Sequence, residues 1–593
     1  ALFIGNRALF IRNLDFQRLE RDLQLATGFL QLRIQGGILT LLLELRDFLL
    51  QFTGFDIRRE LREITGGKNT PTNKSEGKEQ KTLHHNTNGF GPFDGALAPL
   101  YSPKSHDNSL FLPRCPIWSF GKCSGPCKLL YPMAENPYRL TEDDILEPPT
   151  TFSGKLRFLG PGFILSASIV GSGELIATTL LGAKAGFVCL WVIIFSCLVK
   201  VALQLEFGKH AIYTGRTTMQ ALNDLPGPRL GRGHLSIWVW LLIMTFKFLQ
   251  VGGIVGGVAL IFMQIPALTD FGLTWWTLFT ALVVAVIVSV GRYGFLEKLS
   301  LVMIGLFTIF TLVSVIALQW TPNAVSSPEI LSGLSFQLPA AAIMIAVGAF
   351  GITGVGGDEI MAYNYWLLEK GYAAYTGPRP GWTNGEAHEI WLRRARGWIR
   401  VMTLDAMAAM ACYTLVTVLF YILGAAILHR SGLVPAKTEL ISQLGTIYTE
   451  SLGGWAFGIF LGGALVVLFS TLLSALAAWA RLFSDAFSQL GWGDFQDPES
   501  RKKFVGTCAF VFPAIWAILF LKFKAPGVMV MIGGVASAFI LLIVVYAAII
   551  MHRKWAPREL EGGQFYKTAF LLSSIAIVAV ALISSAKALG LIS

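Results

Sequence analysis

Charged residues are scarce in this chain. Of its 593 residues, 14% are Asp, Glu, Lys or Arg, 53% are hydrophobic, and the mean hydropathy is +0.57. A soluble globular domain carries about 25% charged residues, so this composition excludes that class and indicates a polytopic helical membrane protein. The net charge of +11 does not indicate nucleic-acid binding, because most basic residues lie in loops between apolar runs, where they set membrane orientation.

Sequence patterns of enzymes are absent as well. There is no glycine-rich nucleotide-binding loop, no spacing typical of a catalytic triad, and no histidine in the middle of an apolar run. The seven cysteines are scattered and lack the spacing of a zinc site. We therefore expect no enzymatic activity and no cofactor.

Methionine is missing from the first 132 residues, and Met133 is the first one in the chain. We expect translation to start at or near Met133. Residues 1–132 are then an upstream extension, mostly disordered with room for one short helix within 9–64; a genuine cytosolic appendage is the alternative. Residues 133–157 form an acidic, proline-containing cytosolic leader.

Eleven apolar runs follow, each near the roughly 20 residues that a membrane-spanning helix needs. They are 158–183, 186–207, 236–262, 273–290, 295–318, 336–368, 398–427, 453–486, 503–521, 526–551 and 568–590. With a cytoplasmic N-terminus, the outer loops hold few basic residues, namely Lys184, Arg430, Lys437, Lys522, Lys524 and Lys587. The other basic clusters then face the cytoplasm, as the positive-inside rule expects, and the odd span count places the C-terminus outside.

Two of these runs are interrupted by glycine clusters that carry acidic residues. The first contains Gly171-Ser172-Gly173-Glu174, and the sixth contains Gly354-Val355-Gly356-Gly357-Asp358-Glu359. Free backbone groups and carboxylates are costly in hydrocarbon, so such segments persist only where they are buried in protein or line a wet cavity. Two broken helices at corresponding places in two halves indicate a transporter with its substrate site near the bilayer midplane.

The spacing of the breaks also predicts the architecture. Five spans separate them, so spans one to five (158–318) and spans six to ten (336–551) have opposite topology. We expect an all-α membrane fold with a five-plus-five inverted repeat and one extra span at 568–590.

Several short motifs are similar to those of a known family. They are Gly160-Pro161-Gly162-Phe163 and Gly182-Ala183-Lys184-Ala185-Gly186-Phe187 around span one, Gln204, Tyr213-Thr214-Gly215, Leu296-Glu297-Lys298, and Asp405 in span seven. Over about residues 155–590 the chain resembles the Nramp (natural-resistance-associated macrophage protein) family of divalent-metal transporters. The resemblance implies the leucine-transporter-like fold with broken helices one and six.

The metal-binding motifs of that family are altered here. The family's Asp-Pro-Gly-Asn corresponds to Gly171-Ser172-Gly173-Glu174, so the Asp is lost and Glu174 replaces the Asn. Its Met-Pro-His corresponds to Val355-Gly356-Gly357 or, in a shifted register, to Met361-Ala362-Tyr363. Its acidic pair linked to proton movement falls on Lys247 and Gln250 in span three, which indicates uncoupled or differently coupled transport.

The breaks predict an oxygen-rich cation site. Glu174, Asp358 and Glu359 supply carboxylates, and the unwound segments around Gly171 and Gly354 supply carbonyl oxygens. Such a shell suits Mg²⁺, Mn²⁺ or Ca²⁺, whereas a Met361 thioether facing the site would favour manganese or iron. In a purely structural alternative, Ser172 and Asp358 are N-caps of the second half-helices, with Glu174 and Glu359 in their first turns.

Other polar residues lie inside the apolar runs. Lys247 is either an internal cation that pairs with a site carboxylate or a side chain that snorkels to an interface. Lys247, Gln250 and Asp405 are the candidates for coupling or gating. Arg481 and Asp485 are expected to pair at i, i+4. Small residues in span three predict close helix packing: Gly252, Gly253, Gly256 and Gly257.

The sequence therefore predicts a secondary transporter that moves a divalent metal cation, with Mg²⁺ or Mn²⁺ favoured, by alternating access. Its expected partners are the lipid bilayer of the cell (inner) membrane and the metal ion. Two alternatives stay open. One is a transporter of a small organic solute such as an amino acid, and the other is a non-transporting membrane sensor.

Overall fold

The structure is a computed structural model that describes residues 136–290, 293–381, 385–435 and 437–588. The expectations for residues 1–132 lie outside the described residues. Within the described ranges the chain is almost entirely helical, as the sequence predicts.

The segment predicted as the first repeat contains five helical units. Span one consists of α4 (Pro161–Ile169), η1 (Ser172–Thr178) and α5 (Thr179–Ala185). Span two consists of η2 (Gly186–Cys189) and α6 (Leu190–Thr214). Spans three to five are α8 (Leu235–Phe262), α9 (Gly272–Val290) and α10 (Tyr293–Ala317).

The second repeat also begins with a broken helix. Span six consists of α12 (Ile343–Ile352) and α13 (Gly357–Lys370), and span seven of α15 (Glu386–Leu423) and η6 (Gly424–His429). Spans eight to eleven are α17 (Ala456–Gln489), α18 (Pro498–Phe523), α19 (Pro526–Ile550) and α20 (Gln564–Ala588).

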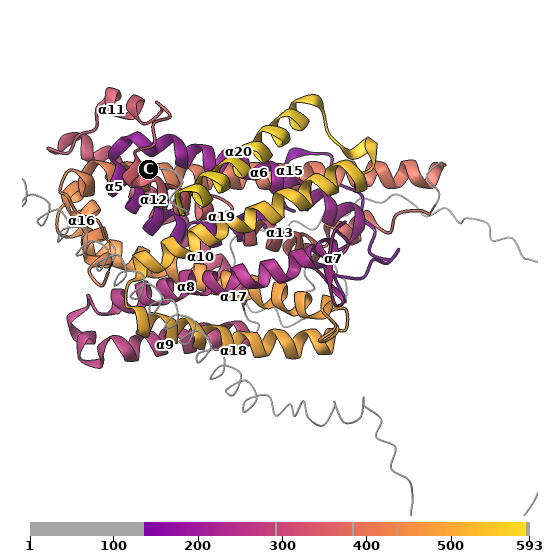
Figure 1. The fold of residues 1–593 in the computed structure, drawn as a ribbon, viewed down its shortest axis with the longest axis horizontal. Coiled ribbons are helices and arrows are strands. Elements are labelled where there is room, and N and C mark those ends of the chain that lie inside the picture. The colour runs from indigo at the N-terminus through magenta and orange to yellow at the C-terminus, as the bar shows by residue number, and fades with distance from the viewer. Residues whose placement is uncertain (1–135, 291–292, 382–384, 436, 589–593) are drawn as a thin grey trace, which may run out of the picture. The chain divides into compact units, whose positions relative to one another are not determined.

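Short elements connect the spans. The helical ones are α3 (Phe152–Leu156), α7 (Thr218–Asn223), η3 (Pro266–Phe271), η4 (Leu318–Trp320), α11 (Ser327–Ser332), η5 (Ala340–Ala342), α14 (Tyr372–Thr376), α16 (Leu440–Leu452), η7 (Met551–Trp555) and η8 (Arg558–Leu560). A small antiparallel ribbon departs from the all-α expectation: β1 (Arg229–Leu230) pairs with β2 (Gly233–His234), with Arg229 opposite His234. In Figure 1, α11 and α16 lie at one end of the long helices and α7 at the other.

The described residues contain 9 helices that are long and apolar enough to cross a membrane, fewer than the eleven predicted runs. Two features account for the difference. The second half of span one continues through η2 into α6 as one run, Ser172–Thr214, and span five counts only as a shorter apolar helix, Ile304–Trp320. Large apolar side chains point outward on several of these helices, as expected for surfaces in contact with lipid: Leu242, Leu282, Leu306, Ile309, Leu572 and Leu582.

The glycines of span three provide close helix packing, as predicted. A side chain on Gly253 would place its Cβ 2.7 Å from the carbonyl oxygen of Pro526 in α19, and one on Gly252 would lie 3.0 Å from the carbonyl oxygen of Trp516 in α18. Residues without side chains let helix backbones approach closely inside a membrane. The α8 helix is thereby held against α18 and α19, with its polar residues facing the middle of the bundle.

Two expectations need correction. Span seven begins at Glu386, twelve residues before the predicted start at residue 398. The basic segment that precedes the apolar run belongs to the same helix. Arg481 and Asp485 do not pair with each other. The Arg481 guanidinium binds Glu369 of α13 at 2.6 Å, and Asp485 accepts a hydrogen bond from the Tyr365 hydroxyl at 2.6 Å. Partners on a neighbouring helix take the place of the local i, i+4 contact.

Candidate functional site

Both predicted breaks are present. The α4 helix ends at Ile169, and η1 starts at Ser172 as a π-helical segment, a form that is frequent at functional sites. The α12 helix ends at Ile352, four residues are unwound, and α13 starts at Gly357. Gly354 has φ +64°, a backbone conformation that favours glycine. The second break thus coincides with Val355-Gly356-Gly357, and not with the Met361 segment of the shifted register.

The two breaks share one local arrangement. In each, a glutamate accepts the N–H of a glycine three residues earlier: Glu174 Oε2 from Gly171 at 3.4 Å, and Glu359 Oε2 from Gly356 at 2.7 Å. A carboxylate at this position satisfies a free N–H and is favoured by the positive end of the helix. The N-cap residues are therefore Gly171 and Gly356, and not Ser172 and Asp358 as in the structural alternative.

Glu174 links the first break to the second. Its Oε1 accepts hydrogen bonds from the N–H of Gly354 at 3.3 Å and from the Thr417 hydroxyl of α15 at 3.2 Å. The side chain is fully buried and does not line the cavity described below. Glu174 therefore holds spans one, six and seven together behind the cavity.

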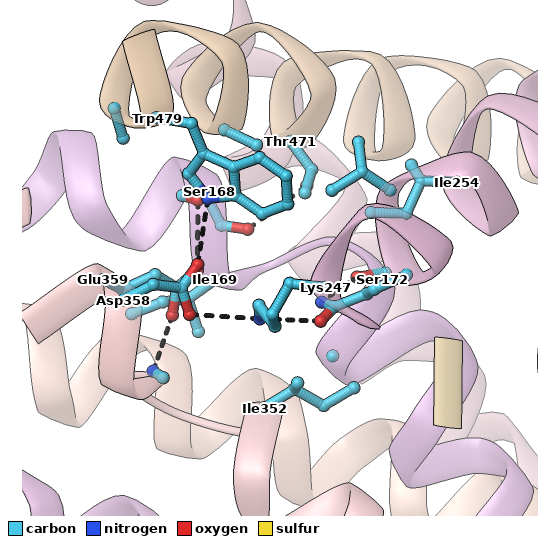
Figure 2. Close-up of a pocket in the computed structure, with 16 residues that line it drawn as sticks. Ser168, Ile169, Ser172, Lys247, Ile254, Ile352, Asp358, Glu359, Thr471 and Trp479 are labelled. Atoms are coloured by element: carbon cyan, nitrogen blue, oxygen red, sulfur yellow. Dashed lines mark hydrogen bonds and ion pairs between the residues drawn. The ribbon is translucent and has the colours of Figure 1, made fainter. Parts of the chain in front are cut away.

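Asp358 lies opposite Lys247. The Lys247 ammonium is 3.0 Å from Asp358 Oδ1, an ion pair, and donates a hydrogen bond to Gln250 Oε1 at 2.7 Å (Figure 2). The Trp479 indole of α17 donates to Asp358 Oδ2 at 3.0 Å. Lys247 and Asp358 are 3% and 5% exposed, so the ammonium is inside the protein and does not snorkel to an interface.

A cavity lies between α4, η1, α8, α12, α13 and α17. Its polar lining comes from both breaks and from α8 and α17, as Figure 2 illustrates: Ser168, Ser172, Lys247, Gln250, Asp358, Glu359, Thr471 and Trp479. Glu359 Oε1 accepts a hydrogen bond from Ser168 at 3.1 Å, which joins the first half of span one to α13. The cavity volume is about 30 Å³, which is large enough to hold a water molecule or a bare ion and little more.

The predicted site residues thus divide into three groups. Asp358, Glu359, Lys247 and Gln250 line the cavity, whereas Glu174, Gly171 and Gly354 form the hydrogen-bonded link behind it. Asp405 belongs to α15, and its side chain reaches the start of α4. There its carboxylate accepts the N–H of Gly160 at 2.9 Å and of Gly162 at 2.5 Å. In this conformation no group of three or more His, Cys, Asp or Glu side chains in the described ranges is arranged to hold a metal ion.

Sequence reasoning missed several polar residues around the breaks. Trp479 and Ser168 bind the two cavity carboxylates, and Lys200 of α6 is fully buried next to the second break. The signal for Lys200 was present, since a lysine inside an apolar run is as costly as Lys247 and indicates a function by default. Nothing in the sequence marked Trp479 or Ser168, because their partners are far away along the chain.

Comparisons with known proteins agree with this architecture. The family described as natural resistance-associated macrophage protein-like matches residues 162–587. An uncharacterized protein of Pasteurella multocida (strain Pm70) is 25% identical over 421 residues, 68% of this chain and 86% of that protein. The divalent metal cation transporter MntH of Bacillus subtilis (strain 168) is 26% identical over 343 residues, 55% of this chain and 71% of that protein.

Solved structures show the same fold. The crystal structure of a manganese transporter of Eremococcus coleocola, in complex with an aromatic bis-isothiourea substituted compound, has a TM-score of 0.53 at 14% identity. The match covers 75% of this chain and 90% of that one. At this identity the similarity establishes the arrangement of the helices and nothing about the substrate.

Proposed function

The chain belongs to the natural resistance-associated macrophage protein-like family of integral membrane proteins, and on that premise we propose that it is a secondary transporter of a divalent metal cation. The observation that carries the proposal is the compact cavity between the two breaks, where the Asp358 carboxylate is paired with a single ammonium. Transport proceeds by alternating access, because the buried pair has to be opened to one side of the membrane before an ion reaches it.

The cavity lining favours a hard cation. Its polar groups are carboxylates, hydroxyls and an amide, together with the Lys247 ammonium and the Trp479 N–H, and none of the described lining residues carries a sulfur or an imidazole. Met361 lies inside α13 and is buried away from the cavity. Oxygen ligands suit Mg²⁺ and Mn²⁺ better than softer metals. We propose Asp358 and Glu359 as the charged ligands, with Glu174 as the carboxylate that supports them.

Lys247 has a specific part in this proposal. Its ammonium occupies the position next to Asp358 that an entering cation needs, so it acts as the counter-ion of the empty site. A divalent ion displaces the Lys247 ammonium from Asp358 because the ion carries the higher charge. Lys247 then moves toward Gln250, which it already contacts, and toward Ser172, which is hydrogen-bonded to Gln250. When the ion leaves, the returning ammonium neutralises Asp358 again, so the carboxylate is never buried without a partner.

An organic solute is the second candidate. It is favoured by one observation, the contact of Asp358 with an ammonium, which is the group that an amino acid or amine would present. The cavity of about 30 Å³ opposes it, because pockets for small molecules are about 300 Å³ or larger and mostly apolar. We therefore favour the ion.

The membrane orientation is part of the same proposal. We place the start of α15 with its arginines, η7 with Arg553 and Lys554, and the ribbon β1–β2 on the cytoplasmic side of the cell membrane. The loops with α11 and α16 are then on the outer side, together with the end of α20.

Uptake into proteoliposomes tests the proposal. The full-length protein is reconstituted, and influx of Mn²⁺ and of Mg²⁺ is followed with an indicator trapped inside the vesicles, beside uptake of a radiolabelled amino-acid mixture. We expect saturable influx of at least one divalent ion, inhibited by the other, and no amino-acid uptake above empty vesicles. Amino-acid uptake without metal influx would favour the second candidate, and absence of any flux would favour a sensor.

A further inference from the structure

A second buried ammonium lies at the break of span six, outside the proposed transport site. Lys200 of α6 is fully buried, and its Nζ donates to the carbonyl oxygens of Phe350 and Thr353, the latter at 2.8 Å. The hydroxyl of Ser196, one turn earlier in α6, donates to the same two carbonyls at 3.0 and 3.1 Å. The Nζ also lies 4.9 Å from the centre of the Phe350 ring.

These carbonyls are available because α12 ends here. The last carbonyls of a helix have no partner within it, and they carry the negative end of the helix dipole. The Thr353 N–H still bonds to Ala349 at 2.8 Å, after which Gly354 turns the chain out of the helix. Two carbonyl oxygens, those of Phe350 and Thr353, therefore converge on the buried Lys200 ammonium, and the Ser196 hydroxyl donates to both of them.

Such a cluster of oxygens is a cation site by its chemistry. In transporters with broken helices, unwound carbonyls and half-helix C-terminal ends coordinate coupling cations. Here the point is occupied by the ammonium of Lys200, whose hydrogen-bond acceptors are both backbone carbonyls.

We propose that these oxygens form a monovalent-cation site that the protein fills with its own Lys200 ammonium. The cation is thus supplied by α6 and cannot leave. It holds the end of α12 against α6 whether or not substrate is bound, and the second break needs no alkali ion to keep its shape. The inference concerns cation binding at the break and does not depend on which substrate crosses the membrane.

Replacing Lys200 by a small residue tests the proposal. The Lys200→Ala variant leaves the oxygens and an ammonium-sized space, whereas Lys200→Met fills that space with an apolar chain. Thermal unfolding of the purified full-length protein in detergent is measured against Na⁺ and against methylammonium, with N-methyl-D-glucamine as the ionic-strength control. Lys200→Ser is measured beside Ala as a second small-residue variant that leaves the same space, so that the test does not depend on the folding of one variant.

We expect the unfolding midpoint of Lys200→Ala and Lys200→Ser to rise with Na⁺ or methylammonium in a saturable way, by roughly 2 °C or more. The wild type and Lys200→Met should not respond beyond the control. A saturable response of the wild type to Na⁺ would overturn the proposal, and so would equal behaviour of the Ala, Ser and Met variants. Since no substrate is present, a failure here is distinct from a failure of the transport proposal.

Discussion

The Lys247 ammonium lies 3.0 Å from the Asp358 carboxylate, and both groups are buried. Removing one member of a buried ion pair leaves the other charge without a partner, which costs about 3 kcal/mol or more. We expect Lys247→Met and Asp358→Asn each to destabilise the protein by about that amount. The double variant should lose less than the sum of the two, as thermal or chemical unfolding of the four proteins will measure. Additive losses would contradict the pairing.

Removing Lys247 should also change cation binding. Because the ammonium competes with an entering ion for Asp358, we expect Lys247→Met to bind Mn²⁺ or Mg²⁺ more tightly than the wild type in calorimetric titration. We also expect slower turnover in uptake, since nothing then displaces the bound ion. Lys209→Met is the matched control, because Lys209 is a buried lysine paired with Glu206 away from the cavity. Weaker binding by Lys247→Met would rule out the counter-ion role.

Glu174 should contribute more to stability than to ion affinity. Its carboxylate accepts hydrogen bonds from Gly171, Gly354 and Thr417 and does not line the cavity. We expect Glu174→Leu to cost about 2 kcal/mol or more, because buried donors lose their acceptor, and Glu174→Gln to cost less since one oxygen remains. Unfolding measurements and metal titrations of both variants check this. A Glu174→Gln protein of normal stability that binds no metal would make Glu174 a direct ligand.

Asp405 should act through the start of α4. Its carboxylate accepts the N–H groups of Gly160 and Gly162, as an N-terminal cap does, and also contacts the Tyr363 hydroxyl at 3.4 Å. Loss of such a cap costs about 1 to 2 kcal/mol. We expect Asp405→Ala to lose about that much stability and to slow uptake without changing the half-saturating metal concentration. A shift in that concentration, with the rate unchanged, would place Asp405 at the ion instead.

An ion pair on the α11 side gives a pH prediction. The N–H of Ser326 and then the Arg430 guanidinium lower the pKa of Glu329 from 4.5 to about 2. A lowered folded-state pKa stabilises the protein above pH 4.5, and this contribution is lost as pH falls toward 2. We expect Glu329→Gln to be less stable than the wild type at pH 7, by less than about 1 kcal/mol for so exposed a pair, and equally stable near pH 2. A difference that persists at pH 2 would have another cause.

The sequence was sufficient to locate the two breaks. Glycine and carboxylates inside apolar runs are so unfavourable in lipid that few explanations exist for them, and the positions of Gly171 and Gly354 therefore marked the two unwound segments. The same reasoning singled out Lys247. The sequence could not show whether Lys247 is an internal cation or a side chain that snorkels to an interface. The answer depends on which face of α8 is turned toward α13.

Contacts between distant segments could not be predicted. The sequence suggested three carboxylates around one ion, but Glu174 bonds to the second break from behind the cavity, and Asp358 faces Lys247 and Trp479. Arg481 likewise binds Glu369 of α13 and not its helical neighbour Asp485. These choices follow from how helices are rotated against one another, and the periodicity of a nearly uniformly apolar helix carries little information on rotation.

Metal uptake by proteoliposomes that contain wild-type, Asp358→Asn or Asp485→Asn protein tests the central claim most directly. Asp485→Asn is the matched control, because Asp485 is a fully buried carboxylate bonded to Tyr365 and Gln489 and does not line the cavity. We predict that Asp358→Asn lowers divalent-ion influx at least tenfold at equal amounts of folded protein, while Asp485→Asn retains most of it. Undiminished influx through Asp358→Asn would contradict an ion path between the two breaks.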